Sequence, residues 1–95
     1  MRIELSGFIE SDLEAIANFI AQDNPTRAVT FIQEIRAKTR LVAKQPLTFQ
    51  LRPEIGEGAR ITIVGRHVIL FRVIGQIVRI ERVVFGGRDL PALLE

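Results

Sequence analysis

Apolar residues recur every three or four positions in the first part of the chain, which is the period of an α-helix. The first apolar stripe consists of Ile9, Leu13, Ile16 and Ile20, with Phe19 alongside it. This stripe predicts a helix over residues 7–22. Ser6 and Ser11 both suit its N-cap, and we favour Ser6 because Ile9 already lies on the stripe.

A second helix is predicted over residues 25–44. Asn24 can accept a hydrogen bond from a free amide of the first turn, and Pro25 suits the first helical position. The apolar stripe of this helix consists of Ala28, Phe31, Ile32, Ile35 and Val42. Because only a tight turn separates the two helices, we expect an antiparallel hairpin with a common apolar side.

The second half of the chain is rich in β-branched residues. Three such runs, over residues 59–64, 67–74 and 77–85, are separated by Gly65-Arg66 and Gly75-Gln76. Glycine followed by another residue is typical of a two-residue type II′ turn. The runs therefore predict a three-stranded antiparallel meander.

The remaining segments complete the predicted fold. Residues 2–5 alternate polar and apolar side chains, which indicates a short first strand. Residues 46–58 show no period, and we expect Leu47, Phe49 and Leu51 to fix this loop to the domain surface. The prediction is one α+β domain over residues 1–95, in which an N-terminal strand and a two-helix hairpin precede the meander.

Two-residue turns fix which residues face each other in the sheet. We assign the helices to the face that carries Ile69, Phe71 and Val73. The opposite face carries apolar residues together with Arg72 and Arg79, which the register pairs directly. Because one helical hairpin covers only one face, we expect a partner to bind the other. In the alternative interpretation Glu81 neutralises the two arginines, or a bulge in one of the turns shifts the register and buries more of this face.

Composition excludes several classes of protein. Apolar residues make up 47% of the chain and charged residues 25%, which is typical of a globular domain. With no cysteine, and with His67 as the one imidazole, the chain offers neither disulfides nor a Cys/His zinc site, so we expect no metal and no cofactor. No apolar run reaches the roughly 18 residues that cross a bilayer, and the acidic start does not resemble a secretion signal. We therefore expect a cytoplasmic protein without membrane contact.

The net charge of +2 hides a gradient along the chain. Residues 1–35 carry two bases against six acids, whereas residues 36–95 carry eleven bases against five acids. Eleven of the thirteen cations are arginines, whose planar guanidinium binds phosphate or carboxylate at two points. The basic half is expected either to bind acidic partners or to form a solvated face.

Four segments spread over nearly the whole chain have a counterpart in a known family. They are Ser11-Asp-Leu-Glu-Ala-Ile-Ala-Asn-Phe-Ile20, Asn24-Pro25 with Ala28 and Phe31, Gly65-Arg-His-Val-Ile-Leu-Phe-Arg-Val73, and Ile80-Glu-Arg-Val-Val-Phe-Gly-Gly-Arg-Asp-Leu90. In this order they resemble the RelE/ParE superfamily of small bacterial toxins, and the ParE branch in particular. The resemblance implies a toxin of a type II toxin-antitoxin system that a ParD-like antitoxin keeps inert.

The two branches of this superfamily share a fold but differ in activity, so the chemistry of the site must distinguish them. ParE-type toxins act on DNA gyrase, whereas RelE-type toxins cut messenger RNA on the ribosome. Ribonuclease chemistry needs a general acid and base, and this chain has no tyrosine, while Lys38 and Lys44 belong to the second helix. His67 and Glu81 are the candidates for proton transfer in the sheet, and the predicted register places them on opposite faces.

Three functional hypotheses follow. The leading one is a toxin that inhibits DNA gyrase by binding, without catalytic residues and without sequence-specific nucleic-acid contacts of its own. The alternatives are a ribosome-dependent ribonuclease and an interaction module without toxicity. Many ParE-like sequences have a tyrosine at the position of His67 and a histidine at that of Phe85, so this chain departs from the pattern there.

The residues predicted to bind partners lie mainly on the uncovered sheet face. For the antitoxin they are Leu70, Arg72, Ile74, Ile77, Arg79 and Val83. For the target they are Arg82, Arg88 and Asp89, although Arg88 and Asp89 could instead form a salt bridge that fixes the tail. The acidic residues Glu10, Asp12 and Glu14 are interpreted as solvated charge near a helix N-terminus, and His67 as a structural residue.

Overall fold

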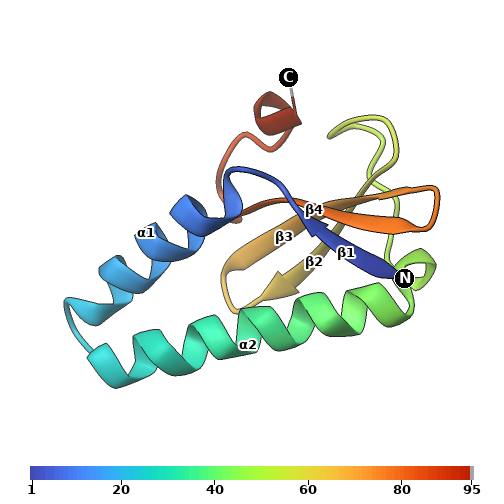
Figure 1. Ribbon diagram of the computed structural model, residues 1–95. Coiled ribbons are helices and arrows are strands. Elements are labelled where there is room, and N and C mark those ends of the chain that lie inside the picture. The colour runs from blue at the N-terminus through green and yellow to red at the C-terminus, as the bar shows by residue number, and fades with distance from the viewer. Residues whose placement is uncertain (95) are drawn as a thin grey trace.

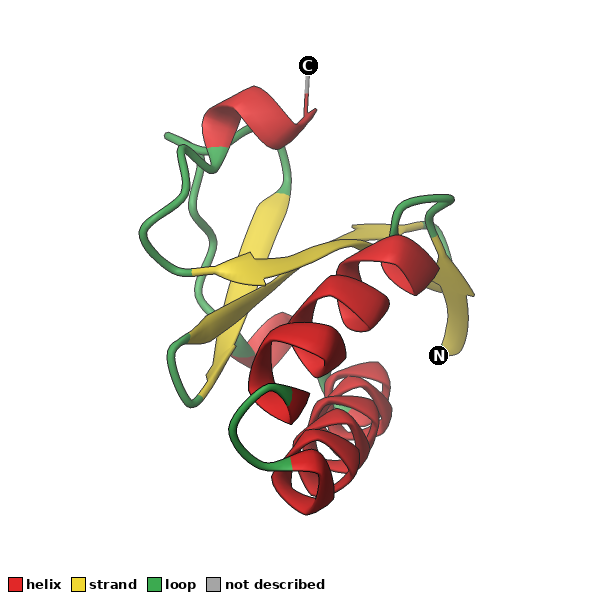
Figure 2. Cartoon of the chain, turned by 90° about the vertical axis from the view of Figure 1, so that its left-hand side faces the viewer, coloured by secondary structure: helices red, strands yellow, loops and turns green. Residues whose placement is uncertain are grey.

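A four-stranded sheet lies between the helical hairpin on one side and a loop with the C-terminal tail on the other (Figure 1, Figure 2). The structure is a computed structural model that describes residues 1–94. Its elements are β1 (Arg2–Leu5), α1 (Ile9–Ala21), α2 (Pro25–Lys44), β2 (Ala59–Val64), β3 (His67–Ile74) and β4 (Ile77–Phe85), with 3₁₀ turns at Pro46–Thr48 and Pro91–Leu94. The predicted α+β architecture is confirmed.

The second helix matches its prediction more closely than the first. The Asn24 side chain accepts a hydrogen bond from the Arg27 N–H at 3.0 Å, so α2 has the expected N-cap. By contrast, α1 begins at Ile9 rather than at residue 7, and no side chain caps it. Ser6 is not its cap, because its oxygen accepts a hydrogen bond from the Phe8 N–H, ahead of the first helical turn. The hydroxyl of this buried side chain donates to the Glu81 carbonyl of β4 at 2.6 Å.

The sheet has the strand order β1-β4-β3-β2. The hairpin of β2 and β3 has the predicted register from Ala59 opposite Arg72 to Val64 opposite His67. Gly65 and Gly75 have φ angles of +58° and +60°, as the first central position of a type II′ turn requires. β1 lies parallel to β4 at the edge of the sheet, and this pairing ends at Leu5 opposite Ile80.

A β-bulge interrupts the pairing of β3 with β4. Arg72 lies opposite Arg79 as predicted, but the register shifts between Leu70 and Phe71, so that Leu70 faces Arg82 and Glu81 is the extra residue. A shift of one residue moves every later side chain to the other face. Val83 therefore points toward the helices, and the prediction that it lies on the uncovered face is wrong, since it is 1% exposed in the core.

The hairpin covers the face of the sheet that carries Phe71, as predicted. The core between helices and sheet contains Phe31, Ile35 and Val42 of α2 together with Ile69, Phe71, Val78, Ile80 and Val83 of the sheet. These eight side chains are each at most 5% exposed, and burial of each stabilises the fold by roughly 1.5–3 kcal/mol. This core holds the sheet and the hairpin in one relative position.

The chain also covers the centre of the opposite face itself. Leu70 is fully buried against Ile55 and Ala59, and Ile61, Leu90 and Leu93 pack around this second cluster. The prediction that Leu70 lies exposed is therefore wrong, because the loop before β2 and the C-terminal tail fold over it (Figure 2). Within the loop Phe49 packs edge-on against Phe71, whereas Leu47 and Leu51 are exposed, contrary to prediction.

The two turn glycines provide a matched test of packing. A Cβ at Gly65 would lie 3.2 Å from the buried Phe31 ring, whereas a Cβ at Gly75 would meet open space. Gly75→Ala should lower the free energy of unfolding by about 1 kcal/mol, which is the cost of placing a side chain at positive φ. Gly65→Ala should lower it by about 1 kcal/mol more because the Phe31 ring must also move. Urea unfolding of both variants measures the difference, and equal losses would contradict the proposed contact.

Candidate protein-binding site

The bulge in β4 is held by two side chains from the start of the chain. The Ser6 hydroxyl donates to the Glu81 carbonyl, and the Asp12 Oδ2 atom accepts a hydrogen bond from the Val83 N–H at 3.0 Å. These backbone groups point away from β3, at an edge that β1 no longer covers. Their bonds to side chains satisfy polar groups that would otherwise be unpaired at a partly buried position.

Asp12 also forms a two-point ion pair with Arg82. The Arg82 Nε and Nη2 atoms donate to the two Asp12 oxygens at 2.8 Å each, and the side chains are 15% and 9% exposed. The hydrogen bond to Asp12 raises the pKa of Arg82 above its ordinary value, against the opposing effect of burial. The guanidinium also lies over the Phe8 ring. The interpretation of Asp12 as solvated charge is thus wrong, and Arg82 is engaged inside the protein.

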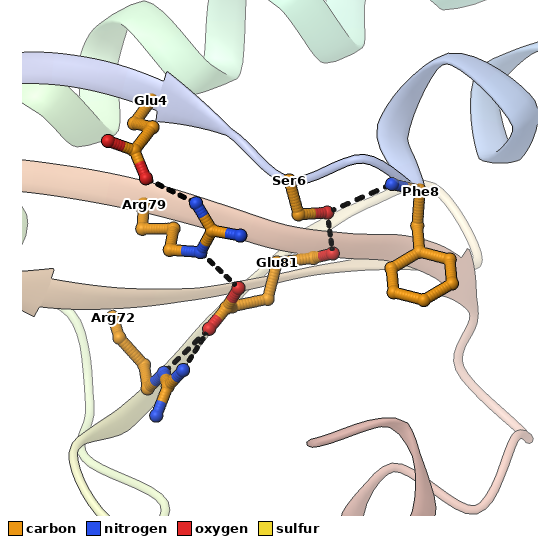
Figure 3. A network of polar contacts seen from close by, with 6 residues as sticks. All are labelled: Glu4, Ser6, Phe8, Arg72, Arg79 and Glu81. Atoms are coloured by element: carbon orange, nitrogen blue, oxygen red, sulfur yellow. Dashed lines mark hydrogen bonds and ion pairs between the residues drawn. The ribbon is translucent and has the colours of Figure 1, made fainter. Parts of the chain in front are cut away.

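On the face of the sheet that points away from the helices, Glu81 bridges Arg72 and Arg79, which lie opposite each other in β3 and β4 (Figure 3). Its carboxylate accepts from the Arg72 Nε at 2.7 Å and from the Arg79 Nε at 2.9 Å. Arg79 also pairs with Glu4 of β1, and this hydrogen bond raises the pKa of Arg79 above its ordinary value. Neutralisation by Glu81, one alternative weighed from the sequence, is therefore present. The other alternative, a register shift by a bulge, is also found, but the bulge lies within β3 and β4 rather than in a turn.

The six residues predicted to bind the antitoxin do not form one surface. Leu70 and Val83 are buried on opposite sides of the sheet. Arg72, Ile77 and Arg79 are half-buried, and Ile74 is exposed at the turn between β3 and β4. Contact of these last four residues with an antitoxin stays a prediction.

A different concave surface lies where α1 meets the end of β4. This groove of about 520 Å³ is lined on the helix side by Ala15, Ile16 and Phe19 and on the sheet side by Val84 and Phe85, among others. Asp12, Arg66, His67, Val83 and Arg88 complete its lining. The groove is thus mainly apolar, with charged side chains among its lining residues. We call it the α1–β4 groove.

His67 borders this groove in a neutral form. Its ring lies 5.3 Å from the Phe31 ring and 6.0 Å from the Phe85 ring, measured between centroids. Burial lowers the pKa of His67 below its ordinary value of 6.5, so the imidazole is uncharged at pH 7. Its Nδ1 atom is buried without a hydrogen-bond partner among the described residues.

Arg88 and Asp89, predicted to reach the target, are both exposed just after β4. Among residues 1–94, no ion pair involves either of them, so the alternative of a tail-fixing salt bridge is not observed there. Arg88 lines the α1–β4 groove. The same part of the chain contains no cluster of acidic or histidine side chains able to hold a metal ion, and no helix suited to crossing a membrane.

The comparisons with known proteins agree with this architecture. Residues 3–90 match the family model described as the ParE toxin of the type II toxin-antitoxin system parDE. The chain belongs to the ParE toxin family. A solved structure titled as the chromosomal ParDE TA system from P. aeruginosa has the same fold, with a TM-score of 0.78 at 22% identity over 90% of this chain and 95% of that chain. A comparison with curated proteins gives no match.

Sequence reasoning missed three residues of the groove in this ParE family member. Phe19 lies beside the apolar stripe of α1, and Phe85 ends a strand whose facing changes at the bulge. Arg66 occupies a turn, where a charged residue carries little information. A bulky aromatic residue next to the core stripe of a helix was the one available signal, because such a side chain has no place in the core.

The Asp12 ion pair should be a major contribution to stability. Asp12→Ala leaves the partly buried Arg82 charge and the Val83 N–H without a partner, so the free energy of unfolding should fall by about 2–4 kcal/mol. Glu14→Ala removes an exposed carboxylate from the same helix and should change it by less than about 0.5 kcal/mol. Urea denaturation monitored by circular dichroism measures both. Similar losses in the two variants would show that the pair does not stabilise the fold.

The His67 environment predicts a dependence of stability on pH. The unfolded chain binds a proton at this imidazole near pH 6.5, whereas the folded chain binds it only at lower pH. Unfolding therefore takes up a proton in this range, and stability should fall as pH decreases through 6.5. Between pH 7.5 and pH 5.5, the unfolding free energy of wild type should therefore fall relative to that of His67→Phe, which has no imidazole to titrate. A constant difference over this range would contradict the lowered pKa.

Proposed function

We propose that this ParE family member inhibits DNA gyrase by binding it, and that a ParD-like antitoxin neutralises it in the cytoplasm. Family membership supports the toxin-antitoxin assignment. We propose gyrase as the target, a ParD-like protein as the antitoxin and the cytoplasm as the compartment. In this view the protein is not an enzyme, and its effect comes from occupying a surface of its target.

The state of the arginines is the observation that carries this proposal. Arg72, Arg79 and Arg82 are each engaged with carboxylates of the chain itself. A ribonuclease would need free cations over the scissile phosphate, together with a general acid and base. His67 is kept neutral beside the α1–β4 groove, while both Glu81 oxygens are bound to arginines on the opposite face. This separation supports binding rather than RNA cleavage.

The partner surfaces follow from the residues that remain accessible. We propose that Arg88 and Asp89 contribute to target binding, since both are exposed and outside ion pairs within residues 1–94. Arg72, Ile74, Ile77 and Arg79 remain proposed contacts of the antitoxin. Their electrostatic attraction for an acidic partner is reduced because Glu4 and Glu81 offset both arginine charges.

A purified supercoiling assay tests the target. Wild-type protein should inhibit gyrase and accumulate cleaved DNA, and Arg88→Glu should weaken this inhibition by about tenfold because a cation that reaches the target is reversed. Arg2→Glu reverses an exposed arginine on β1 and serves as the control. Full gyrase activity at excess wild-type protein would reject the gyrase proposal. Codon-position cuts in cellular messenger RNA would favour the ribonuclease instead.

A further inference from the structure

The α1–β4 groove exists because β1 is shorter than β4. The pairing of β1 with β4 ends at Leu5 opposite Ile80, and β4 continues to Phe85 without a strand on that side. α1 approaches this free edge at Asp12, which bonds to Val83. From there the helix runs away from the sheet toward the α1–α2 turn (Figure 1). The groove lies between the second half of α1, at Ala15, Ile16 and Phe19, and the end of β4.

Large aromatic side chains on both walls of the groove are exposed to solvent. Phe19 is 73% exposed and Phe85 is 52% exposed, one on each wall. Ile16 and Val84, which also line the groove, are buried. Two exposed aromatic rings in a mainly apolar groove are typical of a site that receives a bulky side chain from another protein.

The charges around the groove are positive. Arg66 lies in the β2–β3 turn and Arg88 follows β4, and both are exposed lining residues. Asp12, the acidic residue of the lining, is already paired with Arg82 on both oxygens, and His67 is neutral. Asp89 is exposed next to Arg88 but does not line the groove. The surface therefore complements an acidic segment that carries apolar side chains.

We propose that the α1–β4 groove anchors the antitoxin, which inserts a bulky apolar side chain between Phe19 and Phe85 and places carboxylates against Arg66 and Arg88. This inference rests on the proposed function, in that it requires an antitoxin. It moves the main antitoxin contact away from the sheet face predicted from the sequence. A segment bound there also covers Arg88, the residue proposed to contact the target, so neutralisation follows from occlusion.

A second copy of this chain is a poorer occupant of the groove. In a two-fold symmetric pair the groove would face itself, bringing Arg66 and Arg88 of both copies together. Like charges placed opposite each other at an interface oppose association. An acidic chain meets no such penalty.

Binding measurements with matched variants test this inference. The probe is the protein encoded by the reading frame next to the toxin gene, purified and labelled with fluorescein. Phe19→Ala and Arg66→Glu should each weaken its binding to the full-length toxin by about tenfold, and the double variant by more. Leu41→Ala and Arg2→Glu are the controls, since both residues are exposed and lie outside the groove, and they should change binding less than about twofold.

Each outcome separates the docking site from the proposed function. Unchanged affinity in both groove variants, or no binding of the probe to wild type, overturns the docking site even if gyrase is inhibited. Loss of gyrase inhibition in the groove variants with full probe affinity assigns the groove to the target and also overturns it. Concentration-dependent self-association that Phe19→Ala abolishes, with probe binding unchanged, gives the groove to a second copy. Weakened probe binding supports the docking site even if wild type leaves gyrase active.

Discussion

The bulge in β4 and the two side chains that hold it determine how the rest of the protein is arranged. Ser6 and Asp12 bond to backbone groups of β4 on either side of Arg82, at the edge where β1 has ended. Because the extra residue reverses the facing of the strand, Val83 enters the core and Arg82 reaches Asp12. The same bonds tie the start of α1 to the sheet. The groove between α1 and β4 is a consequence of this junction.

Internal ion pairs decide which part of the surface is available to a partner. Although the C-terminal half of the chain is rich in arginine, Arg72, Arg79 and Arg82 bind carboxylates of the same molecule. These pairs reduce the attraction of the sheet for phosphate or for an acidic protein. What remains is an apolar groove with two exposed arginines, which suits recognition of a polypeptide better than chemistry on RNA.

The fold was more predictable than the binding site, for physical reasons that particular residues illustrate. The stripe of α2 and its cap at Asn24 are local signals, and so are Gly65 and Gly75 at the turns. In contrast, the side of the sheet on which Val83 lies and the burial of Leu70 depend on contacts with other parts of the chain. Val83 changes face because of a bulge that Ser6 and Asp12 stabilise from the N-terminal region. Leu70 is buried because a loop and the C-terminal tail, both distant in sequence, cover it. Periodicity within a strand contains neither kind of information.

The sequence by itself determined the order and type of the elements, the helix-facing side of β3 and the direct pairing of Arg72 with Arg79, because each depends on periods and turns a few residues long. Tertiary structure decided where the charges are neutralised, which apolar residues stay exposed and where the concave surface lies. Those properties arise from contacts between residues far apart in the chain, such as the ion pair of Asp12 with Arg82 and the packing of Leu90 against the cluster that contains Leu70. Such contacts form only once the hairpin, the sheet and the tail have packed together.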